Sequence, residues 1–338
     1  MVKFDELIFL YTNVCNLRCG HCVSNASPEG QKTIDAEKVT SAIQDAAKHG
    51  IRRLCFTGGE SLLHEEDVLD FIKYGKSLGM GSTIVTNGFW GNDPNEAKDL
   101  LDEFKTAGLD ELQVSTDRFH LEYIPLSQIE TIIKESKDIG LNIVILISRI
   151  KDDMIAENIK KELKKQDVEI SEQSVVPEGR GVSLLGQLPL DSWTIDELNS
   201  TPCNRSINLN VSYDNRVQIC CCLPPDISPE SPLILGNLME EDLDTIIRRA
   251  EKNLLADFLF FWGPVTLYEY IKTKLGDTDF VPLKEYYKPC HLCRQLLGDK
   301  RYMPLIVNLL NQEDIKLKLK AANFVYEHKN YITSSKEQ

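Results

Sequence analysis

From residue 6 to about residue 177, short apolar segments alternate with longer amphipathic ones. The first three apolar segments are ELIFLYT at residue 6, IRRLCFT at residue 51 and STIVTN at residue 82. The first amphipathic segment begins at Asp35 and ends at Gly50, a residue suited to a helix C-cap. Six such units follow one another, and each helix is long enough for a right-handed crossover, so the pattern predicts a parallel sheet.

Six units are fewer than a closed eight-fold barrel needs, so we expect an α/β fold built on a partial (β/α)6 TIM-like barrel. In barrels of this kind the active site lies at the carboxyl ends of the strands. Loops of unusual composition fall there: CNLRCGHC, GGES, NGFW and DRFH follow the first four strands. Any one of them could be a solvated turn, but four at one end of the sheet indicate a functional site.

The net charge of −14 argues against a nucleic-acid surface, because binding phosphates needs clustered Lys and Arg. It also disfavours an anionic membrane. Acidic residues interrupt the N-terminal MVKFDELIFLY, and the run FLFFWGPV is too short to span a bilayer, so we predict no signal peptide and no membrane span. In the cytoplasm, which we therefore expect, ten cysteines favour metal binding or chemistry over disulfides.

The composition changes after Gly186, where prolines recur and a second set of cysteines begins. We predict a partial barrel at residues 1–186, a smaller domain at 187–300 and a helical C-terminal tail at 301–338. INLNVSYDNRVQIC indicates a pair of strands whose tight turn is Asp214-Asn215. The aromatic FLFFW at 258–262 is more typical of a core, although it could line a peptide groove.

Cys15, Cys19 and Cys22 have the spacing C-x3-C-x2-C after the first strand. Structural zinc takes four ligands, and the only nearby fourth candidate, His21, lies awkwardly between two of the cysteines. A [4Fe–4S] cluster held by three thiolates instead leaves one iron open to a further ligand. An open iron makes a reactive site.

With Gly58-Gly59-Glu60 after the second strand, this motif resembles the radical S-adenosylmethionine (SAM) family, over residues 6 to about 180. The resemblance implies that a [4Fe–4S] cluster on the three cysteines binds SAM. It implies that a Cβ at the glycine pair would obstruct the methionine amino group. His21 stands where an aromatic residue is usual. The implied SAM contacts are Gly58, Gly59, Glu60, Thr86, Asn87, Ser115 and Asp117.

Two further features near this motif have alternative interpretations. Arg180, in VPEGRG, could bind a carboxylate of SAM or substrate, as the resemblance to SPASM-type enzymes suggests, or form a structural salt bridge. Asp117 and His120, in STDRFH, could act as acid and base, but Asp117 could equally cap a turn.

The second cysteine set resembles the twitch domain of radical SAM enzymes, a shortened SPASM module. That resemblance implies a second, auxiliary [4Fe–4S] cluster on Cys203, Cys220, Cys290 and Cys293; a zinc ribbon with the same ligands is the alternative. Asn215 stands where glycine is usual and tolerates a positive φ. Cys221 and Cys222 are then surplus. They are either small buried residues or, as in radical SAM peptide epimerases, hydrogen-atom donors, with Cys221 the first choice and Cys222 the second.

The expected function is L-to-D epimerisation at Cα of a ribosomally made peptide, through a 5′-deoxyadenosyl radical and a cysteine donor. Peptide thioether or carbon–carbon crosslinking, dehydrogenation of a small alcohol and a non-enzymatic zinc-binding scaffold are the alternatives. The resemblance implies a reductant such as flavodoxin or ferredoxin. Because the first barrel strand begins at residue 6, we expect no N-terminal leader-recognition domain, so that a stand-alone leader-binding protein or direct groove binding would be needed.

Overall fold

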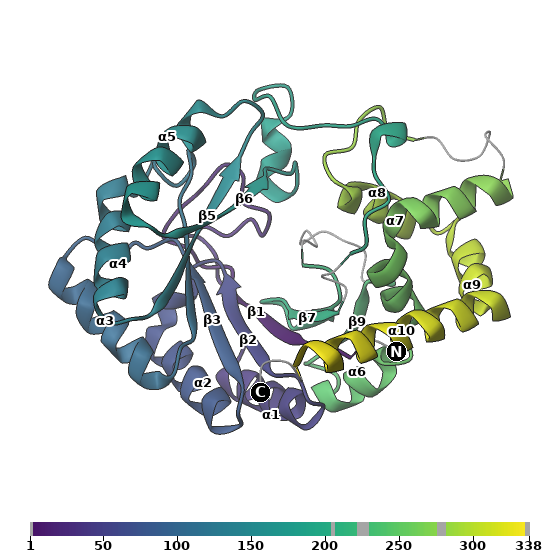
Figure 1. The fold of residues 1–338 in the computed structure, drawn as a ribbon, viewed down its shortest axis with the longest axis horizontal. Coiled ribbons are helices and arrows are strands. Elements are labelled where there is room, and N and C mark those ends of the chain that lie inside the picture. Colours follow the sequence, from purple (N-terminus) through teal and green to yellow (C-terminus); the bar gives the residue numbers. More distant parts are fainter. Residues whose placement is uncertain (1–2, 204–206, 222–229, 276–281, 335–338) are drawn as a thin grey trace.

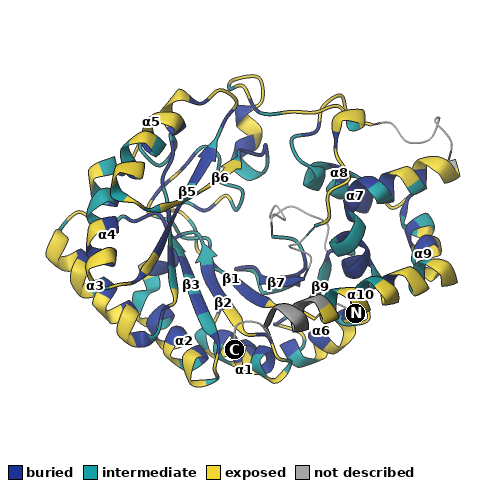
Figure 2. Ribbon diagram, viewed as in Figure 1, coloured by how far each residue is buried: buried dark blue, intermediate teal, exposed yellow. Residues whose placement is uncertain are grey.

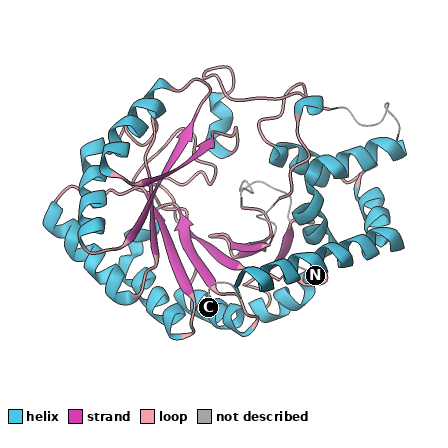
Figure 3. Cartoon of the chain, in the orientation of Figure 1, coloured by secondary structure: helices cyan, strands magenta, loops and turns pink. Residues whose placement is uncertain are grey.

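The computed structural model describes residues 3–203, 207–221, 230–275 and 282–334. Its described strands form one nine-stranded sheet in the order β6-β5-β4-β3-β2-β1-β7-β8-β9 (Figures 1 and 3). The strands are β1 (Glu6–Thr12), β2 (Arg53–Gly58), β3 (Gly81–Thr86), β4 (Glu111–Ser115), β5 (Asn142–Arg149), β6 (Glu169–Ser174), β7 (Asn208–Val211), β8 (Arg216–Gln218) and β9 (Ile234–Asn237).

Strands β1 to β6 are parallel, and a helix follows each of the first five, which confirms the predicted partial barrel. Asp35, Asp93 and Asp153 begin three of these helices by accepting hydrogen bonds from first-turn amides. The helices are α1 (Ala36–Lys48), α2 (Glu65–Ser77), α3 (Pro94–Ala107), α4 (Leu126–Asp138) and α5 (Met154–Leu163). Short 3₁₀ turns are η1 (Ser61–His64), η2 (Lys164–Gln166), η3 (Gly179–Leu184) and η4 (Ile195–Glu197).

The helices that cover the sheet have exposed residues on the outside of the molecule (Figure 2), and the two faces of the sheet also differ in burial. In β3 and β4 every second residue is buried, among them Ile84 and Leu112, and these pack in the same core as residues of the covering helices. The alternate residues, such as Thr83, Val85 and Gln113, are only half-buried. A strand with a period of two places them on the opposite face. The inner face of the partial barrel is therefore accessible to a ligand.

Strands β7 to β9 continue the same sheet beyond β1. β7 pairs in parallel with β1, with Glu6 opposite Asn208, and β8 returns antiparallel to it. The turn between them has Asn215 at φ 67°, so the predicted tight turn and its positive φ are both present. Helix α6 (Leu243–Ala250) then packs on α1, where His49 Nε2 lies 2.8 Å from Asp244 Oδ1. The division into three domains stays a prediction.

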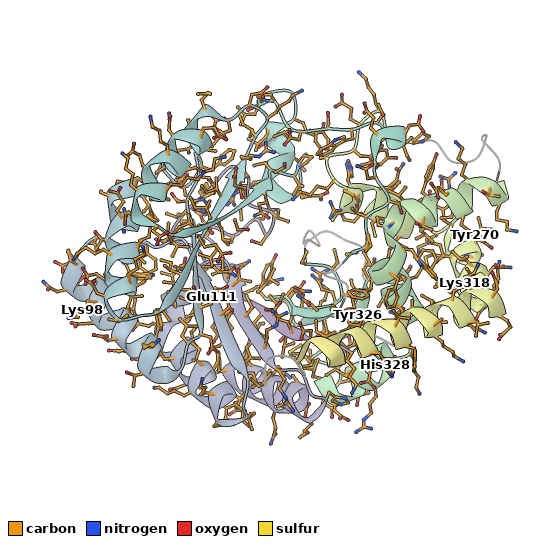
Figure 4. All side chains as sticks on the ribbon, viewed as in Figure 1. Lys98, Glu111, Tyr270, Lys318, Tyr326 and His328 are labelled. Carbon is orange, nitrogen blue, oxygen red and sulfur yellow. The ribbon has the colours of Figure 1, made fainter. Side chains whose placement is uncertain are left out.

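The C-terminal part is helical, as predicted, and lies on the right in Figure 1. Its helices are α7 (Leu254–Leu275), α8 (Pro289–Gly298), α9 (Met303–Asn311) and α10 (Glu313–Ser334). On α10, the ring of Tyr326 packs edge-on against Phe260 of α7 at 5.1 Å between centroids (Figure 4). Phe258 and Leu259 of the FLFFW segment are buried in the core. No helix in the described ranges is long and apolar enough to cross a membrane.

Candidate active site

The loop after β1 carries Cys15, Cys19 and Cys22 as free thiols on the wall of a cavity of about 220 Å³. The loop is wound tightly, since the Cys22 amide donates to the Cys19 carbonyl oxygen at 3.2 Å. Burial raises the pKa of the Cys15 thiol to about 12, and the negative charges of Glu60, Cys19 and Cys22 add to this. Neighbouring thiols of this kind are suited to binding a metal cation, because the cation replaces their protons and compensates the charge of the thiolates. The donor set suits a [4Fe–4S] cluster.

Gly58 and Gly59, which follow β2, pack directly on the start of the cysteine loop. The Gly59 amide donates to the Thr12 carbonyl at 2.6 Å, and a Cβ at Gly59 would lie 2.0 Å from the Val14 oxygen. Gly58 has φ 127°, which favours glycine. The atoms that a Cβ would meet at either position belong to the end of β1 and the start of the cysteine loop, so the pair lets this loop pack on the end of β2. Contact of the two glycines with SAM stays a prediction.

Glu60 is buried and joins two neighbouring loops. Its carboxylate accepts hydrogen bonds from the amides of Leu62 at 3.1 Å and Asn87 at 2.8 Å. Burial raises the pKa of Glu60 to about 7, although these hydrogen bonds oppose the rise. The Asn87 side chain in turn donates to Asn16 Oδ1 at 2.8 Å, which ties the loop after β3 to the cysteine loop.

Thr86 and Ser115 also line the cavity, at the carboxyl ends of β3 and β4. Thr86 Oγ1 accepts from the Gly88 amide at 3.1 Å and from Trp90 Nε1 at 3.3 Å, which holds the NGFW loop in place. Ser148 and Gln173, from β5 and β6, complete the same wall, and sequence reasoning missed both. The signal was available, because polar residues at the ends of consecutive parallel strands gather at one edge.

Asp117 is buried, and its carboxylate caps the turn after β4. Oδ1 accepts from the amides of Phe119 at 2.9 Å and His120 at 3.2 Å, and Oδ2 accepts from Ser148 N at 3.3 Å. The predicted capping geometry is thus present. Nδ1 of His120 lies 3.0 Å from Oδ1. Burial acts to raise the pKa of Asp117, but the hydrogen bond and charge of His120 hold this pKa below its usual value.

The rings of His21 and His120 pack edge to face at 5.3 Å between centroids, and both lie near the Asp117 carboxylate. His120 lines the cavity, whereas Asp117 stands behind it. Burial lowers the pKa of His120, but the hydrogen bonds to Asp117 and Cys19 outweigh burial and raise it to about 10. Burial lowers the pKa of His21 to about 4, and its ring stacks on Phe119 at 4.5 Å between centroids. His21 therefore presents a neutral flat ring to the cavity, as an aromatic residue would.

Arg180 contacts the cysteine loop from η3, the 3₁₀ turn that follows β6 at the edge of the sheet. Nε donates to the Cys19 carbonyl at 3.0 Å, Nη2 donates to the Ala26 carbonyl at 2.6 Å, and the Arg180 amide donates to the Cys22 carbonyl at 3.0 Å. The side chain also lines the cavity. Its described contacts are thus with backbone carbonyls, and binding of a carboxylate stays a prediction.

A second cavity, of about 230 Å³, is lined by the second cysteine set: Cys203, Cys220, Cys221, Cys290 and Cys293. Burial raises the pKa of the Cys293 thiol well above its ordinary value, and the charges of Cys220, Cys203 and Cys290 raise it further. The four thiols thus line one cavity, where a metal group large enough to reach all of them could take them as ligands. Cys222, the second donor candidate, falls outside the described residues.

A break in α7 positions the first of these cysteines. Gly263 has φ 72° and ψ 178°, and Pro264 follows it inside the helix. The chain crosses closely at this break, because a Cβ at Gly263 would lie 2.0 Å from the Thr201 oxygen. The Cys203 amide then donates to the Leu259 carbonyl at 2.8 Å. On α8, Cys290 and Cys293 are three residues apart and share one helix face.

Residues 9–147 match the family model described as the Radical SAM superfamily. This match identifies a radical SAM domain in the part of the chain that carries the three-cysteine loop, which confirms the prediction from the motif. The family implies a [4Fe–4S] cluster and SAM as cofactors. A structure of anSMEcpe with bound AdoMet shares the fold, with a TM-score of 0.54 and 16% identity over 92% of this chain and 99% of that one.

Among curated relatives, YydG of Bacillus subtilis, named for peptide biosynthesis, is 23% identical over 297 residues, which cover 84% of this chain and 89% of YydG. The PqqA peptide cyclase of Xanthomonas euvesicatoria pv. vesicatoria is 30% identical over 105 residues. That second match spans 31% of this chain and only 27% of the cyclase. Resemblance to an epimerase in particular, and to the twitch module, stays a prediction.

Proposed function

We propose that this radical SAM enzyme modifies a ribosomally made peptide and converts one residue from the L to the D configuration at Cα. The observation that carries the proposal is Cys221, a thiol beside Cys220 on the wall of the second cavity. A peptide substrate is supported by YydG, whose name assigns it to peptide biosynthesis and which matches over 84% of this chain.

In this proposal Cys15, Cys19 and Cys22 hold the SAM-binding [4Fe–4S] cluster. When bound, the cluster and SAM supply a 5′-deoxyadenosyl radical that takes a hydrogen atom from the peptide Cα. The surrounding residues bind SAM and exclude water, since a closed site suppresses side reactions. Those assigned to SAM are Gly58, Gly59, Glu60, Thr86, Asn87, Ser115, Asp117 and Arg180, and His120 with Asp117 is the candidate acid–base pair.

The second cavity would hold an auxiliary [4Fe–4S] cluster on Cys203, Cys220, Cys290 and Cys293. Crowding of four thiols supports one metal group there, but zinc takes the same ligands. Iron and sulfide analysis of anaerobically reconstituted protein separates the two. About eight iron atoms per chain is expected for two cubane clusters, against about four if the second site binds zinc.

Cys221 would complete the epimerisation from the face opposite the abstraction. Its S–H bond breaks, and a new C–H bond forms at the substrate Cα with inverted configuration. The sulfur is then one electron and one proton short, and a reductant such as flavodoxin or ferredoxin, with water, restores the thiol. The peptide itself is neither oxidised nor reduced. A stand-alone leader-binding protein and a cytoplasmic location belong to the same proposal.

The test is anaerobic turnover in deuterated water with a peptide encoded by a small neighbouring reading frame. Epimerisation predicts one deuterium in the product and no mass change in ordinary water. Loss of two hydrogens would instead support crosslinking or dehydrogenation. Cys221→Ala should still release 5′-deoxyadenosine but form no D-residue, whereas Cys55→Ala, which removes a thiol from β2, should keep forming it. Unchanged product from Cys221→Ala would remove Cys221 from the mechanism.

A further inference from the structure

Residues 178–180, at the start of the 3₁₀ turn η3 after β6, contact the cysteine loop on one side. Arg180 donates to the carbonyls of Cys19, Ala26 and Cys22, as described above. Gly179 has φ 55°, and a Cβ there would lie 2.2 Å from the Val23 oxygen and 2.6 Å from the Cys22 oxygen. The backbone of this segment is therefore pressed against the last cysteine of the SAM-cluster motif, with no room for a side chain between them.

The neighbouring Glu178 contacts the other cysteine site. Its carboxylate forms an ion pair with the guanidinium of Arg294, 116 positions further along the chain. Arg294 follows Cys293 on α8 and lines the second cavity. Both side chains are largely removed from solvent, at 12% exposed for Glu178 and 11% for Arg294. A charge-assisted bond between groups this buried is strong and directional, and loss of one partner leaves the other charge uncompensated.

Arg294 also places a positive charge beside the second cysteine set. Arg294 directly follows Cys293 on α8, and both residues line the second cavity. A guanidinium stays charged at any accessible pH, so its field is permanent. The potential of an iron–sulfur cluster depends on net charge and hydrogen bonding around it. A reduced cluster carries one more negative charge, which a nearby cation stabilises.

We propose that the Glu178–Arg294 ion pair couples the two cysteine sites: Arg294 raises the reduction potential of the auxiliary cluster, and Glu178 holds it in place from the segment that braces the SAM-cluster loop. This inference rests on the proposed function, because it requires a cluster on Cys203, Cys220, Cys290 and Cys293. Both residues are positioning residues. Through them, helix α8, which carries Cys290 and Cys293, is joined to the segment that contacts the first site.

The charge effect is tested in the full chain with Cys15, Cys19 and Cys22 replaced by alanine, so that only the auxiliary site binds iron. The potential is measured by redox titration followed by electron paramagnetic resonance. We expect Arg294→Gln to lower it, Glu178→Gln to raise it, and the double substitution to return it close to the starting value. Arg294→Lys keeps the charge and should change it least. Arg248→Gln is the control, because it removes an exposed arginine on α6 that lines neither cavity.

The positioning effect is tested in the enzyme with all its cysteines, by the amount of 5′-deoxyadenosine released per modified peptide. Each single substitution should raise this ratio, on the order of tenfold, because small misplacements of reacting groups are costly. The exchange Glu178→Arg with Arg294→Glu restores an ion pair and should bring the ratio back, while the potential stays low because a negative charge now faces the cluster.

Three outcomes would overturn the proposal. Loss of all iron from the triple-alanine chain would remove the auxiliary cluster, and the inference with it. Retained iron with potentials that move in the same direction for both single substitutions, as a purely structural disturbance would cause, would overturn the inference alone. The inference would also be overturned if the reduction potentials and the 5′-deoxyadenosine ratios of the Glu178 and Arg294 variants matched those of Arg248→Gln.

Discussion

Gly263→Ala tests whether the break in α7 is a requirement of the fold. Its φ of 72° with ψ of 178° is a backbone conformation essentially limited to glycine, which costs a side chain about 1–3 kcal/mol. The new Cβ would also lie 2.0 Å from the Thr201 oxygen, where 3.4–4 Å is ordinary contact. Forcing backbone apart in this way adds about 1–3 kcal/mol. The sum, about 2–6 kcal/mol, is a large part of a typical free energy of unfolding of about 5–15 kcal/mol.

The assay is urea unfolding under anaerobic conditions, followed by far-ultraviolet circular dichroism. Gly79→Ala is the matched control, because Gly79 also has a positive φ of 76° but an added Cβ there meets no atom within 4 Å. That control should lose only about 1–2 kcal/mol. Because Thr201 precedes Cys203, Gly263→Ala should also lower iron bound at the second site while sparing the first. Equal losses for the two substitutions would refute the reasoning, since the clash with Thr201 would then contribute nothing.

Three further predictions follow from local geometry. Gly59→Ala should reduce the iron bound at the first site but not at the second, because its Cβ would displace Val14. Iron analysis in chains that lack each cysteine set in turn measures this, and first-site iron equal to that of the unsubstituted chain would contradict the proposed packing of the loop. Hydrogen bonds from Arg248, then His49, lower the pKa of Asp244 from its ordinary 3.8 to about 2, so the stability that this carboxylate contributes is present above pH 3.8 and is lost as pH falls toward 2. The free energy of unfolding of Asp244→Asn should therefore depend less on pH between these values, and an unchanged pH dependence would contradict the contact. Asn215→Ala should lower the free energy of unfolding by about 1 kcal/mol, whereas Asn215→Gly should leave it nearly unchanged, since φ there is 67°; equal losses in urea unfolding would show that the turn does not depend on φ.

Much of the barrel was predictable because its signals are local. Each β/α unit repeats the same pattern of an apolar strand followed by an amphipathic helix, and caps such as Asp35 lie next to the helices they begin. The ligand spacing of Cys15, Cys19 and Cys22 is also local, so the motif could be identified without any contact information. The turn at Asn215 was predictable for the same reason, because tolerance of a positive φ is a property of the residue type at that position.

The roles within the site were less predictable, since they depend on segments that meet only after folding. Binding of a carboxylate by Arg180 stays a prediction, and the sequence did not indicate that its guanidinium donates to the carbonyls of Cys19 and Ala26, more than 150 positions away. The resemblance implies contact between Gly59 and SAM, which stays a prediction, and the structure adds the close approach of Gly59 to the Val14 oxygen. Asp117 allowed either of two roles, and the amides of Phe119 and His120 favour the cap.

The amino-acid sequence by itself determined the order of strands and helices, the three-cysteine motif and the edge of the sheet at which it lies, because these follow from periodicity and spacing over a few residues. Only the tertiary structure decided that β7 continues the barrel sheet beside β1, that Thr201 crosses the break at Gly263, and that Glu178 meets Arg294. These contacts join distant segments, and their energies depend on shape and burial, which no local pattern of residues records.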